Sequence, residues 1–154
     1  AHAANVSVEG EVGFVGYNEG KKSKGSKLEE IDIFSKESGA DAIAISVGNM
    51  HLQTTKKARI DINKIKEIEN ITNIPLVLHG GSGIPAKIRK KLSKNTNVAK
   101  FNIGTEIRMV FGKTLRKNII KNKKIYDRIG LLKPTIIEMK NLTKKIISNL
   151  GPSL

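Results

Sequence analysis

Apolar residues gather in four short runs along the chain, and each run is followed by a polar turn or an amphipathic stretch. The runs cover residues 6–13, 41–47, 74–78 and 98–103. The first run alternates with a period of two, which predicts a strand with Glu9 and Glu11 on one face. A run such as 42–47 is almost continuously apolar, as is typical of a strand buried on both faces. We therefore predict four strands.

Helical patterns fill the intervals between and after these strands. The spacing of apolar and polar residues predicts helices over residues 27–38, 62–71, 85–93, 105–122 and 133–150. Ser26 is predicted to cap the first helix, because Glu29 follows it three residues later as in a capping box. Gly39 is a suitable residue for the end of that helix.

The alternation of strands and helices predicts an α/β fold with a parallel sheet. A complete TIM (β/α)8 barrel has about 250 residues, whereas this chain has 154. The chain is therefore either a small open α/β domain or the second half of a barrel, and in both cases residues 1–154 form a single domain. It begins with Ala1 rather than Met, which we take as an indication that it is a fragment.

The net charge of +14 raises the question of nucleic-acid binding. Lysine outnumbers arginine 23 to 5, although nucleic-acid recognition favours arginine. Tryptophan is absent, and the four Phe and two Tyr residues are not interleaved with a basic stripe. We interpret the lysines as a solvated surface that attracts anionic substrates, and we expect no specific nucleic-acid partner.

Other features of the composition limit the location of the protein. No apolar run approaches the roughly 18 residues of a membrane span, and no secretory signal is evident. Cysteine is absent, which excludes disulfides and thiolate metal sites. We expect a cytoplasmic protein with no membrane partner.

The chemistry-bearing residues follow the predicted strands directly, which is where parallel α/β folds place their sites. His51 follows the second strand and His79 ends the third. Neutral imidazole is a common zinc ligand, and a catalytic zinc keeps three protein ligands. His2 precedes the first strand and is interpreted as a surface or packing residue, so the implied metal site lacks one ligand.

Two adjacent segments have the composition of a phosphate-binding site. Gly80, Gly81 and Ser82 form a turn in which backbone N–H groups can approach a phosphate closely. Residues 102–105, Asn-Ile-Gly-Thr, end the fourth strand and open a helix, whose N-terminus favours an anion. The alternatives are an ordinary tight turn and a simple helix-capping role for Thr105.

Three glutamates complete the set of candidates. Glu9 and Glu11 share one face of the first strand, where buried carboxylates need a metal or a basic partner. Glu19 lies in a loop rich in Gly, Lys and Ser, from which a general base can be delivered on closure. Glu19 is equally compatible with being an ordinary polar loop residue.

These motifs, in this order and spacing, resemble class II, zinc-dependent ketose-bisphosphate aldolases. Residues 8–13 (Val-Glu-Gly-Glu-Val-Gly) are similar to the family's Val-Glu-Ala-Glu-Leu-Gly, and residues 48–51 to its Gly-Thr-Ala-His. Residues 76–83 match Leu-Val-Leu-His-Gly-Gly-Ser-Gly, and residues 100–105 resemble Lys-Ile-Asn-x-x-Thr. Residues 126–128 resemble a Tyr-Asp-Pro-Arg element.

The resemblance implies a (β/α)8 barrel of which this chain is strands five to eight. It also implies cytoplasmic cleavage of fructose or tagatose bisphosphate to dihydroxyacetone phosphate and glyceraldehyde 3-phosphate, with Zn²⁺ polarising the carbonyl. The full-length protein would be a homodimer or homotetramer.

The resemblance also assigns roles residue by residue. His51 and His79 would be zinc ligands, Glu11 a ligand of a second metal or a further cation, and Glu19 the proton-abstracting base. Dihydroxyacetone phosphate would be held by Gly80, Gly81, Ser82, Asn102, Ile103, Gly104 and Thr105.

The chain also departs from the family pattern. The Asp-His element that supplies the catalytic aspartate and the first zinc ligand is missing, so we expect this chain alone to bind zinc weakly and to lack turnover. Leu52 replaces a glycine that contacts substrate, and Gly104 replaces a polar residue of fructose-specific members. A related aldolase for another phosphorylated sugar, or a non-catalytic phosphate- or nucleic-acid-binding domain, remains the alternative.

Overall fold

The protein is described by a computed structural model over residues 1–17, 20 and 23–151. The elements, in chain order, are η1 (His2–Ala4), β1 (Glu9–Val12), α1 (Leu28–Glu37), β2 (Ala42–Ile45), α2 (Ile62–Glu69), β3 (Leu76–Leu78), η2 (Gly81–Gly83), α3 (Ala86–Asn95), β4 (Val98–Phe101), α4 (Thr105–Lys121) and α5 (Arg128–Leu150). All four strands are parallel and pair in the order β1-β2-β3-β4.

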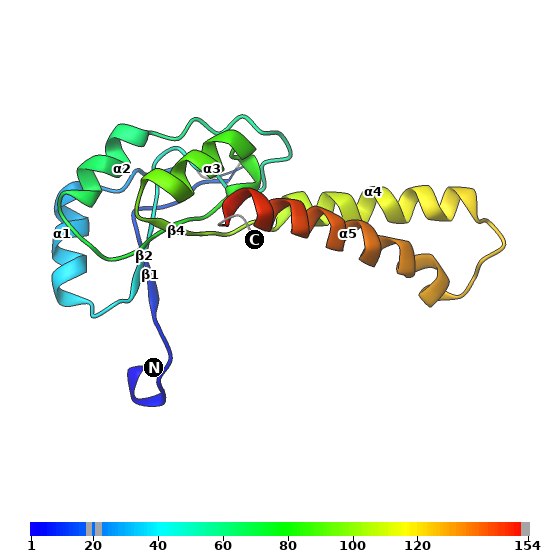
Figure 1. Ribbon diagram of the computed structural model, residues 1–154, viewed down its shortest axis with the longest axis horizontal. Helices are drawn as coiled ribbons and strands as arrows, with labels where there is room; N and C mark the ends of the chain where they lie inside the picture. Colours follow the sequence, from blue (N-terminus) through cyan, green and yellow to red (C-terminus); the bar gives the residue numbers. More distant parts are fainter. Residues whose placement is uncertain (18–19, 21–22, 152–154) are drawn as a thin grey trace.

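The strand order distinguishes between the two folds that the sequence left open. Each strand lies beside the next one along the chain, and helices α1, α2 and α3 lie along one side of the sheet (Figure 1). An open doubly wound sheet reverses its strand order at a switch point and carries helices on both faces. Sequential order with helices on one side is the geometry of a barrel wall.

The hydrophobic core lies between the central strands and these helices. Every residue of β3 is fully buried, as the continuous apolar pattern predicts. Ile31 of α1 and Ile65 and Ile68 of α2 are also fully buried, so the three-residue spacing of isoleucines does mark one helix face. Burial of each such side chain stabilises the fold by about 1.5–3 kcal/mol.

The predicted cap of α1 is wrong. Lys27 occupies the N-cap position and makes no side-chain capping bond. The Ser26 hydroxyl instead donates to the Val12 carbonyl and accepts the Ser46 amide at 2.8 Å, so it joins the ends of β1 and β2. A buried hydroxyl takes the tertiary partners that its surroundings offer, and these outweighed the local capping signal. The end of the helix is as predicted, with Gly39 left-handed at φ 66°.

Helices α4 and α5 form a long hairpin that projects from the sheet (Figure 1). The last helix begins at Arg128 rather than Lys133 and contains Pro134 within it. Proline has no N–H for the carbonyl four residues earlier. The Asn118 side chain of α4 supplies the missing donor, at 3.3 Å from the Gly130 carbonyl and 2.8 Å from that of Leu131.

Large apolar side chains remain exposed on this hairpin. They include Ile120 and Ile129, each 70% exposed, together with Ile119, Ile125, Tyr126, Ile136 and Ile137. No helix within the described residues combines the length and the apolar character that crossing a membrane requires.

Candidate functional site

The two predicted histidines meet at the carboxyl ends of β2 and β3. The centres of the His51 and His79 rings are 5.7 Å apart. Tyr17, which follows β1, lies against the outer side of His51 with ring centres 5.1 Å apart. The His51 amide donates to the Gly16 carbonyl at 2.8 Å, so the loops after β1 and β2 are tied together. The convergence of His51 and His79 follows from the parallel arrangement of their strands.

Both glutamates of β1, Glu9 and Glu11, lie within hydrogen-bonding distance of the His79 ring. Its Nε2 lies 2.9 Å from a Glu9 oxygen and its Nδ1 lies 3.1 Å from a Glu11 oxygen. The prediction that Glu9 and Glu11 share one face of the strand is therefore confirmed. Carboxylate partners of this kind fix the orientation of a ligand imidazole.

Lys100 of β4 extends this network. Its ammonium lies 2.5 Å from the second oxygen of Glu9. Burial favours the neutral form of Glu9, but the hydrogen bonds from Lys100 and His79 outweigh it and hold the pKa of Glu9 below its ordinary value. Glu9 is therefore a carboxylate at neutral pH, and the three strands β1, β3 and β4 contribute to one ionic cluster.

Burial and the neighbouring His79 lower the pKa of His51, and the opposing effect of Glu11 is smaller. His51 is therefore neutral at pH 7. Neutral imidazole, with a free lone pair, is the form that binds metals.

The donors in this cluster fit part of a zinc site. Two imidazoles lie side by side with carboxylates next to them, which is the nitrogen and oxygen donor chemistry that zinc accepts. Because Glu9 and Glu11 bond both ring nitrogens of His79, one of them must release a nitrogen before His79 can bind zinc. Across residues 1–17, 20 and 23–151, no group of three His, Cys, Asp or Glu side chains is arranged to hold a metal ion. A catalytic zinc at the histidine pair would need a third ligand beyond them.

A cavity of about 440 Å³ adjoins His51. Its lining consists of His51, Leu52, Gly80, Ser82, Phe101, Asn102, Ile103, Gly104, Thr105 and Arg108. Six of the seven residues predicted to bind phosphate are therefore gathered around one space. The backbone alone brings them together, because they follow the neighbouring strands β3 and β4.

Gly80 is required at the turn after β3 for two reasons. Its φ of 64° is left-handed, a conformation that residues with a side chain rarely adopt. A Cβ atom there would also collide with the Met50 carbonyl. Only glycine lets the loops after β2 and β3 approach this closely.

Gly81, unlike Gly80 and Ser82, does not line the cavity. Its N–H donates to the Asn102 carbonyl at 3.0 Å, and a Cβ atom would press against the Ile103 side chain at 2.9 Å. This amide therefore joins the turn after β3 to the segment 102–105, and Gly81 is the one member of the two segments that does not line the cavity.

The sequence analysis did not single out Arg108, which is the one arginine or lysine that the described residues contribute to the lining of this cavity. Its Nη2 donates to the Thr105 hydroxyl at 3.2 Å. The signal was available, because residues three apart in the first turn of a helix lie on one face. An arginine beside a helix N-terminus strengthens the attraction for an anion.

Two further sequence features can be placed. Leu52 lines the cavity with a left-handed φ of 55°, so it holds a conformation that suits glycine better. Gly104 lies next to the Arg108 guanidinium, where a Cβ atom would be 3.5 Å from it. Glu19 lies outside the described residues.

Fold and site together define a class of protein. It is half of a parallel β/α barrel that carries two imidazoles and a cavity at the carboxyl edge of its strands, where barrel enzymes hold their active sites.

The chain belongs to the class II fructose-bisphosphate aldolase family, because the family model described as "Fructose-bisphosphate aldolase class-II" matches residues 1–153. Members of the family are generally zinc-dependent. A fructose-bisphosphate aldolase of Geobacillus stearothermophilus is 34% identical over 139 residues, which cover 87% of this chain and 48% of the relative.

Solved structures confirm the fold. The YdjI aldolase from Escherichia coli K12 has a TM-score of 0.73 at 22% identity, over 97% of this chain and 50% of that one. A putative fructose-1,6-bisphosphate aldolase from Coccidioides immitis has a TM-score of 0.76 at 20% identity, over 97% and 53% respectively. This chain spans about half the length of the relatives it matches, as the barrel-half prediction requires.

Proposed function

We propose that this chain is the carboxyl-terminal half of a zinc-dependent ketose-bisphosphate aldolase. The reaction is the reversible breaking of the C3–C4 bond of fructose or tagatose 1,6-bisphosphate, which gives dihydroxyacetone phosphate and glyceraldehyde 3-phosphate. The observation that carries the proposal is that His51, whose ring centre lies 5.7 Å from that of His79, lines the cavity that the phosphate would occupy. The carbonyl carbon and the phosphorus of dihydroxyacetone phosphate are joined by a single CH2–O unit, so one molecule can reach both features.

One group of residues is proposed to bind the metal and another to bind the substrate phosphate. His51 and His79 supply two zinc ligands, and Glu11 is placed to bind a second metal or another cation. Bound zinc supplies polarisation of the substrate carbonyl. The substrate phosphate is held by the segments containing Gly80, Gly81, Ser82, Asn102, Ile103, Gly104 and Thr105, to which we add Arg108.

Glu19 is proposed as the base on the strength of the family resemblance. In the condensation direction its carboxylate takes a proton from the carbon beside the carbonyl of dihydroxyacetone phosphate, and in cleavage it returns that proton. Replacement of Glu19 by Gln should abolish proton exchange at that carbon and leave phosphate binding unchanged.

The zinc assignment is tested by calorimetric titration. We expect His51→Ala and His79→Ala each to weaken zinc binding by more than about tenfold. His2→Ala removes an exposed imidazole that pairs with Asp41 and is the matched control. Equal zinc affinity in all four proteins would overturn the assignment.

The catalytic part of the proposal needs the amino-terminal half. We expect the 154-residue chain alone to bind zinc weakly and to cleave neither sugar. We expect the coding sequence upstream of Ala1 to supply an Asp-His pair after an apolar strand. A polypeptide that carries both halves should cleave fructose or tagatose bisphosphate, and assay of the two sugars side by side identifies the preferred epimer. Cleavage of neither by that polypeptide would favour an aldolase for another phosphorylated sugar.

The alternative is a phosphate- or nucleic-acid-binding domain without catalysis, and the net charge of +14 favours it. That function predicts micromolar binding to DNA or RNA with a steep salt dependence. The aldolase proposal predicts only weak, non-specific binding. Fluorescence anisotropy with a labelled oligonucleotide between low and physiological salt separates the two.

We further propose that the full-length protein is a cytoplasmic homodimer or homotetramer. The absence of cysteine supports a reducing compartment, and the exposed apolar residues of the α4–α5 hairpin support assembly. We expect Ile120→Ser combined with Ile129→Ser to lower the mass measured by light scattering. Ile33→Ser, which changes an isoleucine of α1 that is 57% exposed, is the control.

A further inference from the structure

Arg89 of α3 is buried to an unusual degree for an arginine, with only 2% of the residue exposed. Its Nη1 donates to the Glu106 carboxylate at 3.0 Å and, at 3.4 Å, to the Gly81 carbonyl. Its Nε–H has no hydrogen-bond partner among the described residues. A buried ion pair with an unsatisfied N–H contributes little to stability, and apolar side chains of similar volume are often as good or better. The stability of the fold therefore gives no sufficient reason for Arg89.

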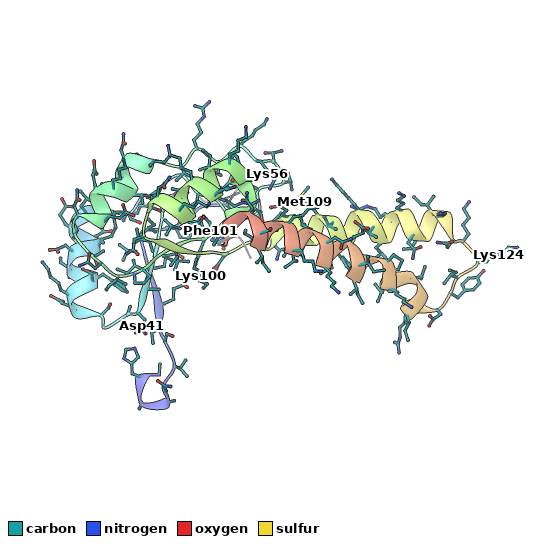
Figure 2. The ribbon with its side chains drawn as sticks, in the orientation of Figure 1. Asp41, Lys56, Lys100, Phe101, Met109 and Lys124 are labelled. Atoms are coloured by element: carbon teal, nitrogen blue, oxygen red, sulfur yellow. The ribbon has the colours of Figure 1, made fainter. Side chains whose placement is uncertain are left out.

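Glu106, the partner of Arg89, connects the loops that follow three different strands. One carboxylate oxygen accepts from Lys56 at 2.7 Å, in the loop after β2, and the other accepts from Arg89 at 3.0 Å. Its backbone N–H donates to the Ser82 hydroxyl at 3.0 Å, in the turn after β3. Glu106 itself lies in the first turn of α4, after β4. Figure 2 shows Lys56 near Met109, at the point where the hairpin leaves the sheet.

This arrangement decides what Ser82 can offer to a ligand. Because the Ser82 oxygen accepts the Glu106 N–H, its own proton points to another acceptor. Ser82 lines the cavity together with His51, so an anion there is a suitable acceptor. The Gly81 carbonyl, which Arg89 approaches, belongs to the residue whose N–H bonds Asn102. Arg89 therefore contacts the Gly81 carbonyl in the segment 80–82 and Glu106, which follows the segment 102–105, although Arg89 itself does not line the cavity.

We propose that Arg89 is a positioning residue for the anion cavity: through Glu106 and the Gly81 carbonyl it holds the Ser82 hydroxyl and the start of α4 in the geometry that a phosphate group requires. Lys56 assists by fixing the second oxygen of Glu106. The inference rests on the proposed function, because it assumes that the cavity binds phosphate. It adds a residue of α3 that touches neither metal nor substrate.

The test measures inorganic phosphate and zinc binding to the same variants of the whole chain by calorimetry. Arg89→Met keeps an apolar side chain of similar length and removes the guanidinium group. We expect the affinity for phosphate to fall about tenfold or more. Zinc affinity should stay within about twofold, because the histidines are not part of the network. Arg116→Met, which removes an exposed cation from α4, is the control and should change neither affinity.

A second pair of variants separates positioning from charge and from stability. Arg89→Lys keeps the charge but lacks the planar fork that reaches two acceptors, so phosphate affinity should remain low. The double variant Arg89→Met with Glu106→Leu removes both members of the ion pair. It should regain the thermal stability of the unmodified chain but not its phosphate affinity.

The outcomes are distinguishable. Unchanged phosphate affinity in Arg89→Met, or full affinity in Arg89→Lys or in the double variant, overturns the positioning role and leaves the proposed function intact. If Arg89→Met does not fold, the double variant decides alone. If the unmodified chain binds no phosphate, the proposed anion cavity and this inference both fail.

Discussion

At the residue scale, the turn after β3 depends on a glycine that has no substitute. Gly80 combines a left-handed backbone with close approach to the Met50 carbonyl. Gly39 has nearly the same φ, 66° against 64°, but no atom lies within 4 Å of its Cβ position. Substitution of Gly39 therefore tests the cost of a left-handed backbone alone, whereas substitution of Gly80 adds the cost of a steric clash.

We expect Gly39→Ala to lower the free energy of unfolding by about 1 kcal/mol, through left-handed strain alone. Gly80→Ala should cost more and should also abolish phosphate binding, because the loop after β2 must move. Urea denaturation and phosphate titration of both variants check this. Equal losses of stability in the two, with phosphate binding retained, would contradict it.

The carboxylate of Glu106 gives a pH-dependent contribution to stability. Burial alone would raise the pKa of Glu106, but Lys56 and Arg89 outweigh it and hold the pKa below the ordinary value of 4.5. A carboxyl with a lowered pKa in the folded state stabilises the fold fully above pH 4.5. That contribution is lost as pH falls through the folded value.

We therefore expect the difference in unfolding free energy between the unmodified chain and Glu106→Gln to be constant near neutral pH and to shrink below pH 4.5. Denaturation at a series of pH values measures it. Glu67→Gln is the control, because Glu67 is exposed and its one ion pair within the described part of the chain is with Lys64. A difference that grows in acid would contradict the sign.

At the scale of elements, a side chain of α4 replaces a hydrogen-bond donor that α5 lacks. Pro134 removes a donor from α5, and Asn118 of α4 supplies one. The pair explains why α5 continues through a proline that would otherwise end or kink it. The start of α5 at Arg128 is set by the Asp127 side chain, which accepts the Gly130 amide at 2.7 Å.

Replacement of Asn118 by Ala should lower the free energy of unfolding by about 0.5–1.5 kcal/mol, the net contribution of a hydrogen bond, because the Gly130 and Leu131 carbonyls are half-buried. In a Pro134→Ala background the helix regains its own donor, so the same change should cost less. Asn141→Ala, at an exposed position of α5, is the control. Equal costs of Asn118→Ala in the two backgrounds would show that Asn118 does not act through the proline.

At the scale of the whole molecule, the sheet ends on two strands with a single neighbour each in the described residues, β1 and β4. Exposed strand edges promote association between chains. The net charge of +14 opposes it, and salt screens that repulsion. Edges and charge therefore make opposite contributions to self-association.

We expect the mass of the 154-residue chain, measured by sedimentation velocity, to rise with protein concentration and with salt. Binding to a nucleic acid would weaken with salt, so the two kinds of association are distinguishable. A monomer at every concentration and salt would contradict the prediction.

The sequence could predict most of the elements and the positions of the site residues. Strand and helix patterns depend on nearest neighbours along the chain, and the parallel order then brings His51, His79 and the segments 80–82 and 102–105 to one edge. The cap at Ser26 was wrong because its partners, Val12 and Ser46, lie at the ends of β1 and β2, far from Ser26 in the sequence. No local pattern contains that information.

What the sequence by itself determined is the set of βα units, the glycines at left-handed turns and the family to which the chain belongs. These depend on local periodicity and on motifs that are contiguous in the chain. Only the tertiary structure decided between barrel wall and open sheet, placed Arg108 in the cavity and paired Arg89 with Glu106. Strand order and the partners of buried charges are properties of segments far apart in the sequence, so they are fixed only when the chain folds.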